Sequence, residues 1–355
     1  KVMCQILWFC ATIVMLNIVA GMKLPCQTKL IIKRILMETI NVEMEDIFNK
    51  KTSVKQEWLE GRNIYVFSDF HSGDGTARDN FKYLGNETNL MQCLKYIKKE
   101  DENSAILILG DFLEFWQSPF GSVFKNNISL MDEFADTEAV YILGNHDNDL
   151  LDFLDPKISP LLGHKFFDRM GEAVLINRGD KRIALAHGHE VDPFNSSAVP
   201  GKGRVLAIIA GMFEDKIGSP FLPNGKSVES SLLKVGEWLL SIGMQLYAKF
   251  KNISTPEQAE SGQGLTASKS NDLTQKNIES WEKIKNEKKE FDVLVCGHTH
   301  RPGIAKNSEN ICWYYNSGSW ASNRNTYLKI DLKGEITIHE WKDGGTILFD
   351  ETITY

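Results

Sequence analysis

The chain has 355 residues, of which 42% are hydrophobic and 25% are charged, as in an ordinary soluble globular protein. That length accommodates one large domain with an insertion, or two small domains. The 40 Lys and Arg residues against 47 Asp and Glu residues give a formal net charge of -7. Proteins that bind nucleic acid usually carry a basic surplus, so we expect no nucleic-acid partner.

The first part of the chain is strongly apolar. Residues 2–22 hold almost no polar side chain, a length that suits a membrane span or a signal sequence. Basic residues follow the segment, and the positive-inside rule then keeps the remainder in the cytoplasm. We treat residues 1–36 as a separate segment that is an anchor, a signal or an artefact of an over-long gene start. The expected location is cytoplasmic, with membrane association left open.

The six cysteines give no metal or disulfide framework. Three of them lie in the first 26 residues, and none forms a C-x-x-C pair. This distribution favours a reducing compartment for the body of the protein.

Five short apolar runs predict β-strands that are buried on both faces. They cover residues 63–69, 104–111, 139–145, 182–187 and 291–297. A helical pattern at residues 90–99 separates the first two runs, which predicts an α/β fold built from βαβ units.

The end of the chain has a different pattern. Residues 326–331, 335–341 and 346–349 are short alternating runs between turns that contain glycine. They predict an antiparallel meander that closes a second sheet.

A long insertion interrupts the strand series. Residues 227–250 and 271–290 have helical periodicity, and residues 252–270 between them are polar. We predict a helical cap at residues 200–290, inserted into a domain made of residues 60–199 and 291–355.

Clusters of polar residues follow the five buried strands and hold six of the eight histidines. In chain order they are Asp69-Phe70-His71, Gly110-Asp111, Gly144-Asn145-His146-Asp147, His187-Gly188-His189 and Gly297-His298-Thr299-His300. Sites assemble at the carboxyl ends of strands, and residues two apart point to the same side. One such cluster is weak evidence, but five at strand ends predict a metal site rather than scattered structural residues.

The residue types narrow the chemistry. Imidazole and carboxylate together suit borderline divalent ions such as Mn, Fe, Zn or Co. Two such ions can clamp the attacking and leaving oxygens of a displacement at phosphorus. The chain lacks the G-x-x-x-x-G-K-[ST] loop that would indicate other phosphate machinery.

In this order the clusters resemble the signature of the calcineurin-like metallophosphoesterases, over roughly residues 63–320. The resemblance implies a four-layer sandwich of two mixed β-sheets flanked by helices. It also implies two divalent ions, with Mn favoured and Fe, Zn or Co as alternatives. A hydroxide that bridges both ions is the implied nucleophile.

The resemblance also assigns roles to single residues. One ion is expected on Asp69, His71, Asp111 and His300, and the other on Asp111, Asn145, His187 and His298. His146 is expected to assist the leaving group, and Asp147 to orient His146.

A narrower resemblance concerns residues 108–116 (ILGDFLEFW), which are similar to a stretch of the bacterial UDP-diacylglucosamine pyrophosphatases. Those proteins also carry a helical insertion before the final histidine pair. This chain departs from them at His146, where they have Arg, and at His189, where they have Asp.

We therefore expect hydrolysis of a phosphorylated small molecule, with a nucleotide-lipid pyrophosphate as the alternative substrate. An inactive protein-binding scaffold is the alternative of another class. Trp116, His189 and Arg301 are candidate substrate contacts, although packing or a surface ion pair could also explain them. If a membrane is involved, the N-terminal segment or the cap is expected to contact it.

Overall fold

A computed structural model describes residues 53–155, 162–192 and 268–353. The N-terminal segment 1–36 and residues 200–267 of the predicted cap lie outside these ranges. Within them, no helix has both the length and the apolar character that crossing a bilayer requires.

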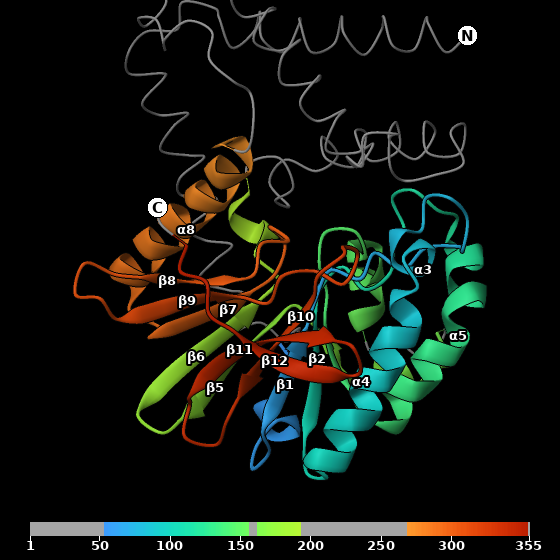
Figure 1. The fold of residues 1–355 in the computed structure, drawn as a ribbon, viewed down its shortest axis with the longest axis horizontal. Helices are drawn as coiled ribbons and strands as arrows, with labels where there is room; N and C mark the ends of the chain where they lie inside the picture. The colour runs from blue at the N-terminus through green and yellow to red at the C-terminus, as the bar shows by residue number, and fades with distance from the viewer. Residues whose placement is uncertain (1–52, 156–161, 193–267, 354–355) are drawn as a thin grey trace, which may run out of the picture. The chain divides into compact units, whose positions relative to one another are not determined.

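The first sheet of the described part has the strand order β12-β11-β10-β1-β2-β3-β4 (Figure 1). The strands are β1 (Ile64–Phe67), β2 (Ala105–Leu109), β3 (Val140–Ile142), β4 (Met170–Gly171), β10 (Asn325–Ile330), β11 (Ile336–Lys342) and β12 (Gly345–Phe349). β1 to β4 run parallel, and β10 to β12 are antiparallel and extend the sheet from the other edge of β1.

This arrangement corrects one prediction. The C-terminal meander does not close a second sheet, because β10 pairs with β1 and the meander belongs to the first sheet. The alternation along these strands indicates that they are strands but does not determine which free edge they join.

The second sheet has the order β5-β6-β7-β9-β8. Its strands are β5 (Ala173–Arg178), β6 (Lys181–Ala186), β7 (Val293–Cys296), β8 (Gly303–Lys306) and β9 (Cys312–Asn316). β7 runs parallel to both β6 and β9, whereas β5 and β8 pair antiparallel at the edges.

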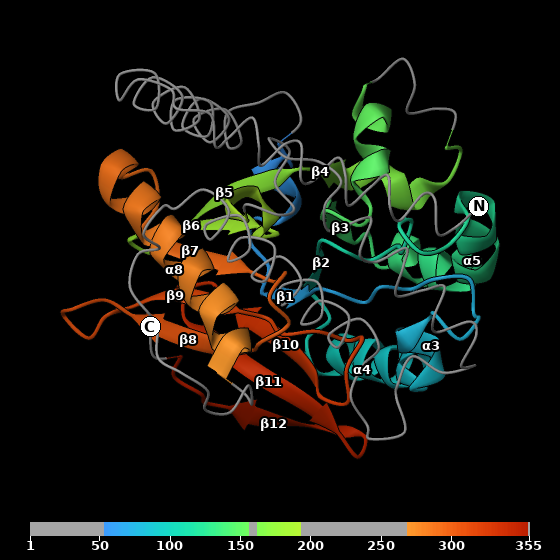
Figure 2. The same cartoon turned by 90° about the horizontal axis from the view of Figure 1, so that it is seen from above.

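The helices cover the outer faces of the sheets (Figures 1 and 2). They are α3 (Asn80–Tyr83), α4 (Asn86–Glu100), α5 (Phe120–Asp136) and α8 (Ser268–Lys288). The short 3-10 turns are η1 (Gln56–Trp58), η2 (Asn148–Leu154), η4 (Lys165–Arg169) and η5 (His189–Val191). Two mixed sheets flanked by helices confirm the expected fold class.

Alternation along β1 shows how the sequence builds two cores. Ile64 and Val66 belong to the aliphatic core between the sheets, together with side chains such as Val295 of β7. Tyr65 and Phe67 point the other way, into an aromatic core beneath α4 and α5. β1 is therefore buried on both faces, which explains its unbroken apolar run.

The described part of the predicted cap contains α8. Trp281 of this helix is fully buried, and its ring centroid lies 6.3 Å from that of Phe291. The helix predicted at residues 271–290 is confirmed, and it lies along the second sheet (Figure 2). The domain boundaries stay a prediction.

Candidate metal centre

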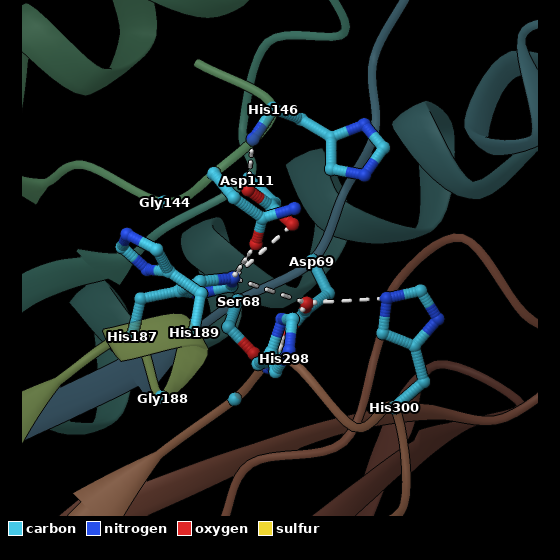
Figure 3. A network of polar contacts seen from close by, with 12 residues as sticks. Ser68, Asp69, Asp111, Gly144, His146, His187, Gly188, His189, His298 and His300 are labelled. Atoms are coloured by element: carbon cyan, nitrogen blue, oxygen red, sulfur yellow. Dashed lines mark hydrogen bonds and ion pairs between the residues drawn. The ribbon is translucent and has the colours of Figure 1, made fainter. Parts of the chain in front are cut away.

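The polar clusters at the five strand ends meet in one place. Figure 3 shows Asp69 and Asp111, from the first sheet, beside His187, His298 and His300, from the second. Ligand atoms of Asp69, His71 and His300 lie within 4.8 Å of one another, and so do those of Asp111, His187 and His298. The structure thus forms two groups of the predicted metal ligands from residues on both sheets, and His71, Glu114 and His146 form a third group within the same distance.

Asp111 lies between the two groups. Its Oδ2 is 3.1 Å from Nε2 of His187 and 3.7 Å from Nε2 of His71. The Oδ1 of Asn145 is 3.2 Å from the same nitrogen of His187. All seven side chains that the sequence singles out are therefore brought together, and Asp111 lies near candidate ligands of both groups.

The charges of the group fit a cation site. Asp69 and Asp111 are buried, which alone would raise the pKa of each carboxyl, but neighbouring imidazoles hold both pKa values below the ordinary range. Burial alone would lower the pKa of His187, yet Asp111 beside it raises that pKa to about 10. Buried carboxylates here require nearby positive charge, which divalent ions on nitrogen and oxygen donors would supply.

The backbone of the site is held in an unusual conformation. Asp69, His71, Asp111, His298 and His300 all have φ between 48° and 65°. Only nine non-glycine residues of the described ranges have a positive φ, so more than half of them are candidate ligands. Such a conformation costs about 1–3 kcal/mol per residue and persists where the surroundings impose it, characteristically at functional sites.

Two glycines of the strand-end clusters leave room for ligands. A Cβ on Gly144 would overlap Oδ1 of Asp111, and a Cβ on Gly297 would overlap Oδ2 of Asp69. Each glycine precedes a predicted ligand in sequence and contacts another ligand in space. This explains why glycine stands at these positions of the clusters.

His146 does not have the carboxylate partner that was expected. Its Nδ1 lies 2.6 Å from Oε2 of Glu114, and its ring stacks on Trp116 with centroids 3.9 Å apart. Glu114 also lies 3.0 Å from Nδ1 of His71. One buried carboxylate therefore contacts both a candidate ligand and His146.

Asp147 has a different set of partners. Its carboxylate accepts hydrogen bonds from the backbone N–H of Gly144 at 2.6 Å and of Phe112 at 2.8 Å, and from the hydroxyl of Tyr141. These contacts tie the strand ends of β2 and β3 together. Asp147 therefore contacts the backbone of the loop, and Glu114 contacts His146; the catalytic roles expected of His146 and Asp147 stay predictions. Glu114 lies within residues 108–116, the stretch singled out in the sequence, but nothing in the sequence pairs it with His146.

The three candidate substrate contacts lie in different surroundings. Trp116 is half-buried against His146. His189 is buried, and its ring centroid lies 5.4 Å from that of His187. Burial lowers the pKa of His189 to about 4. Arg301 lies 3.8 Å from Glu351, so its guanidinium points toward the C-terminal segment. Substrate contact stays a prediction for all three.

The chain is similar to several solved structures at low identity. They include a cold-active protein-tyrosine phosphatase of a Shewanella species, with 13% identity, 85% of both chains covered and a TM-score of 0.37. Zn²⁺-complexed Vps29 from Entamoeba histolytica has 12% identity, with 81% of this chain and 97% of that chain covered and a TM-score of 0.34. A serine/threonine phosphatase from Saccharomyces cerevisiae has 14% identity, with 94% and 92% covered and a TM-score of 0.29.

No protein of curated function matches the sequence. The model of the calcineurin-like phosphoesterase family, in contrast, matches residues 62–302, which contain all five strand-end clusters. The chain therefore belongs to the calcineurin-like phosphoesterase family and is a phosphoric ester hydrolase.

Proposed function

We propose that the protein hydrolyses a phosphoric ester or anhydride with two divalent ions bound by the seven assembled side chains. The observation that carries this proposal is Asp111, which is buried between two groups of nitrogen and oxygen donors. Manganese is favoured, and iron, zinc and cobalt suit the same mixed donor set. When bound, the ions would supply positive charge to the phosphoryl oxygens and make a water molecule a better nucleophile.

His146 is the group that we assign to the leaving oxygen. The carboxylate of Glu114 accepts only, so the Nδ1 that faces it carries a proton. The other nitrogen, Nε2, is then the one able to transfer a proton. The ring is fixed on one side by Trp116 and at Nδ1 by Glu114, which orients Nε2.

A nucleotide-lipid pyrophosphate is the second candidate substrate. Aromatic side chains near His146 favour this substrate. Trp116 stacks on His146, and Phe120, four residues later in the sequence, is 38% exposed. Phe120 stacks on Phe115 with ring centroids 4.5 Å apart. Phe115 is buried, but Trp116 and Phe120 are at least partly exposed, and such rings would suit a substrate with an apolar portion.

The test is a panel assay on metal-stripped full-length protein to which manganese is returned. The panel contains a chromogenic phosphomonoester, a chromogenic phosphodiester, cyclic nucleotides, phosphoproteins and nucleotide-lipid pyrophosphates. We expect metal-dependent hydrolysis of at least one class, and loss of nearly all turnover in Asp111→Ala. Full turnover after chelation would contradict the proposal. Substoichiometric metal with no turnover would indicate the scaffold alternative.

A further inference from the structure

A histidine can bind a metal ion through either ring nitrogen. For His71, His187 and His298, the hydrogen-bond partners indicate which nitrogen is left for the ion. His187 has Nδ1 at 2.9 Å from the carbonyl oxygen of Leu109. His71 has Nδ1 at 3.0 Å from Glu114. A carbonyl or an ionised carboxylate can only accept, so the nitrogen facing it carries a proton, and the other nitrogen is the one that can offer a lone pair to a metal ion.

His298 follows the same rule with the opposite nitrogen. Its Nε2 lies 2.8 Å from Oδ2 of Asp192, a residue that none of the sequence motifs includes. Nε2 of His298 is then the protonated nitrogen, and Nδ1 is the one left to bind a cation with Asp111 and His187.

Asp192 stands at the end of an anchored turn. Its backbone N–H donates to the carbonyl of His189 at 3.0 Å, at the end of η5. The start of the turn is held by Asn277 of α8, whose side chain donates to the carbonyl of Gly188 at 2.8 Å. The carboxylate of Asp192 thus approaches His298 from a segment fixed at both ends.

The contact between His298 and Asp192 is largely shielded from solvent, and Asp192 itself is not one of the candidate metal ligands. The side chains of His298 and Asp192 are 10% and 12% exposed. Within the described ranges, Asp192 belongs to none of the groups whose ligand atoms lie close enough to share an ion. A carboxylate in this place acts on the histidine rather than on the metal.

We propose that Asp192 is a positioning residue that fixes the tautomer and orientation of His298 for the ion shared with Asp111. The inference rests on the proposed two-metal function. Carboxylates that accept from a metal-binding imidazole raise its basicity, and their loss costs about 10–100-fold in metal affinity. Removing the Asp192 charge is therefore expected to weaken one of the two metal sites by that factor.

The test compares full-length wild type with Asp192→Asn in a manganese titration followed by calorimetry. Glu190→Gln is the matched control, because Glu190 lies in the same turn and its carboxylate accepts from the backbone N–H of Gly188 at 2.8 Å. We expect Asp192→Asn to weaken one of two sites 10–100-fold, and Glu190→Gln to change the affinity far less. The proposal would be overturned if manganese affinity fell equally in both variants, or did not fall in Asp192→Asn.

A second measurement does not depend on the folding of a variant. Nitrogen-15 spectra of metal-free wild type, recorded at a pH at which the His298 ring is neutral, should show its proton on Nε2. A neutral ring with its proton on Nδ1 would refute the positioning role even if Asp192→Asn were to misfold. If wild type binds no metal at all, the two-metal function fails; if it binds two ions and Asp192→Asn binds both equally well, only the inference about Asp192 fails.

Discussion

The residues around His146 show how a single carboxylate can serve two parts of one site. Glu114 is 2% exposed and lies within hydrogen-bond distance of both His71 and His146. It also accepts from the backbone N–H of Trp116 at 2.9 Å, so its position is fixed by its own chain segment. We infer that it orients a candidate ligand and the candidate acid together.

The first prediction concerns Glu114→Gln. At saturating manganese it should lower kcat by about 10²-fold, because general acid catalysis contributes roughly 10²–10⁴-fold and depends on an oriented ring. If manganese saturation offsets the effect through His71, the double variant with His146→Ala should be little slower than His146→Ala alone, since residues that act through one another are not additive. Losses in kcat that multiply would contradict the orientation of His146 by Glu114. Glu138→Gln, at a surface ion pair with Arg169, is the control.

For single residues, the sequence predicts which side chains gather at the site, but it does not predict every hydrogen-bond partner among them. Asp69 and His300 come together as expected, with Oδ1 of the one 3.2 Å from Nε2 of the other. The partner of His146 was assigned to its neighbour in sequence, Asp147, although Glu114 supplies the contact. The Asp147 carboxylate instead accepts from the backbone of Gly144 and Phe112, so sequence proximity is a poor guide to side-chain contact.

At the scale of elements, glycine at the end of one strand allows the loop after the neighbouring strand to pack closely against it. Gly144 follows β3, and the space of its missing side chain is filled by Asp111 from the end of β2. A side chain at this position would push apart the ends of two neighbouring strands.

The second prediction therefore compares Gly144→Ala with Gly121→Ala. Gly144→Ala should destabilise the protein by about 1–3 kcal/mol, as overpacking does, and weaken manganese binding because Asp111 must move. Gly121 lies in the first turn of α5, where an added Cβ meets nothing within 4 Å. Gly121→Ala should be neutral or stabilising by up to about 1 kcal/mol. Urea unfolding and metal titration measure both; equal behaviour of the two variants would refute the steric explanation.

The third prediction concerns the pairing of β10 with β11. His339 stacks on Tyr327 with ring centroids 5.2 Å apart, and burial together with Lys329 lowers the pKa of His339 below its ordinary value. The unfolded chain then binds more protons than the folded one as pH falls below about 6.5, so stability decreases toward acid. His339→Gln should lose less stability than wild type between pH 7.5 and pH 5.5. A thermal melt at both pH values measures this, and an identical loss in the two proteins would contradict it.

The elements that the sequence predicts are those with one strong local pattern, either a continuous apolar run or a helical stripe. β1, β2, β3, β6 and β7 are short runs buried on both faces, and α4 has an apolar stripe. β5, β8, β9 and α5 have no counterpart among the predicted elements. In α5 the buried face includes Asn127, a polar residue that interrupts the apolar pattern. Its side chain donates a hydrogen bond to the carbonyl of Gly73 at 2.9 Å.

The sheet that the C-terminal meander joins depends on contacts between residues distant in sequence, which local patterns do not contain.

At the scale of the whole molecule, the candidate metal ligands lie where the two sheets meet. Asp69, Asp111 and Asn145 come from strand ends of the first sheet, and His187 and His298 come from the second. Ions bound by both sets would link the two sheets directly. Metal binding and resistance to unfolding should therefore change together.

The fourth prediction follows from this linkage. Manganese at about 100 times its dissociation constant should stabilise the fold by roughly 2.7 kcal/mol for each site. For a protein of this size, we expect the melting temperature to rise by about 5 °C or more. Calorimetric melts with manganese and with a chelator measure the shift. Asp111→Ala should show little of it, while Asp168→Ala, at an exposed position, should behave as wild type; a shift of equal size in Asp111→Ala would refute the linkage.

The distance along the chain between the two halves of the site has a consequence for synthesis. Asp69 and His298 are 229 residues apart, yet the backbone N–H of His298 donates to the Asp69 carboxylate at 3.1 Å. During translation, Asp69 and Asp111 therefore leave the ribosomal exit tunnel long before His298 and His300 do. A nascent or prematurely terminated polypeptide that ends before Gly297 lacks this pair, so on the proposed two-metal function it would hydrolyse no phosphoric ester before the chain has been made past the end of β7.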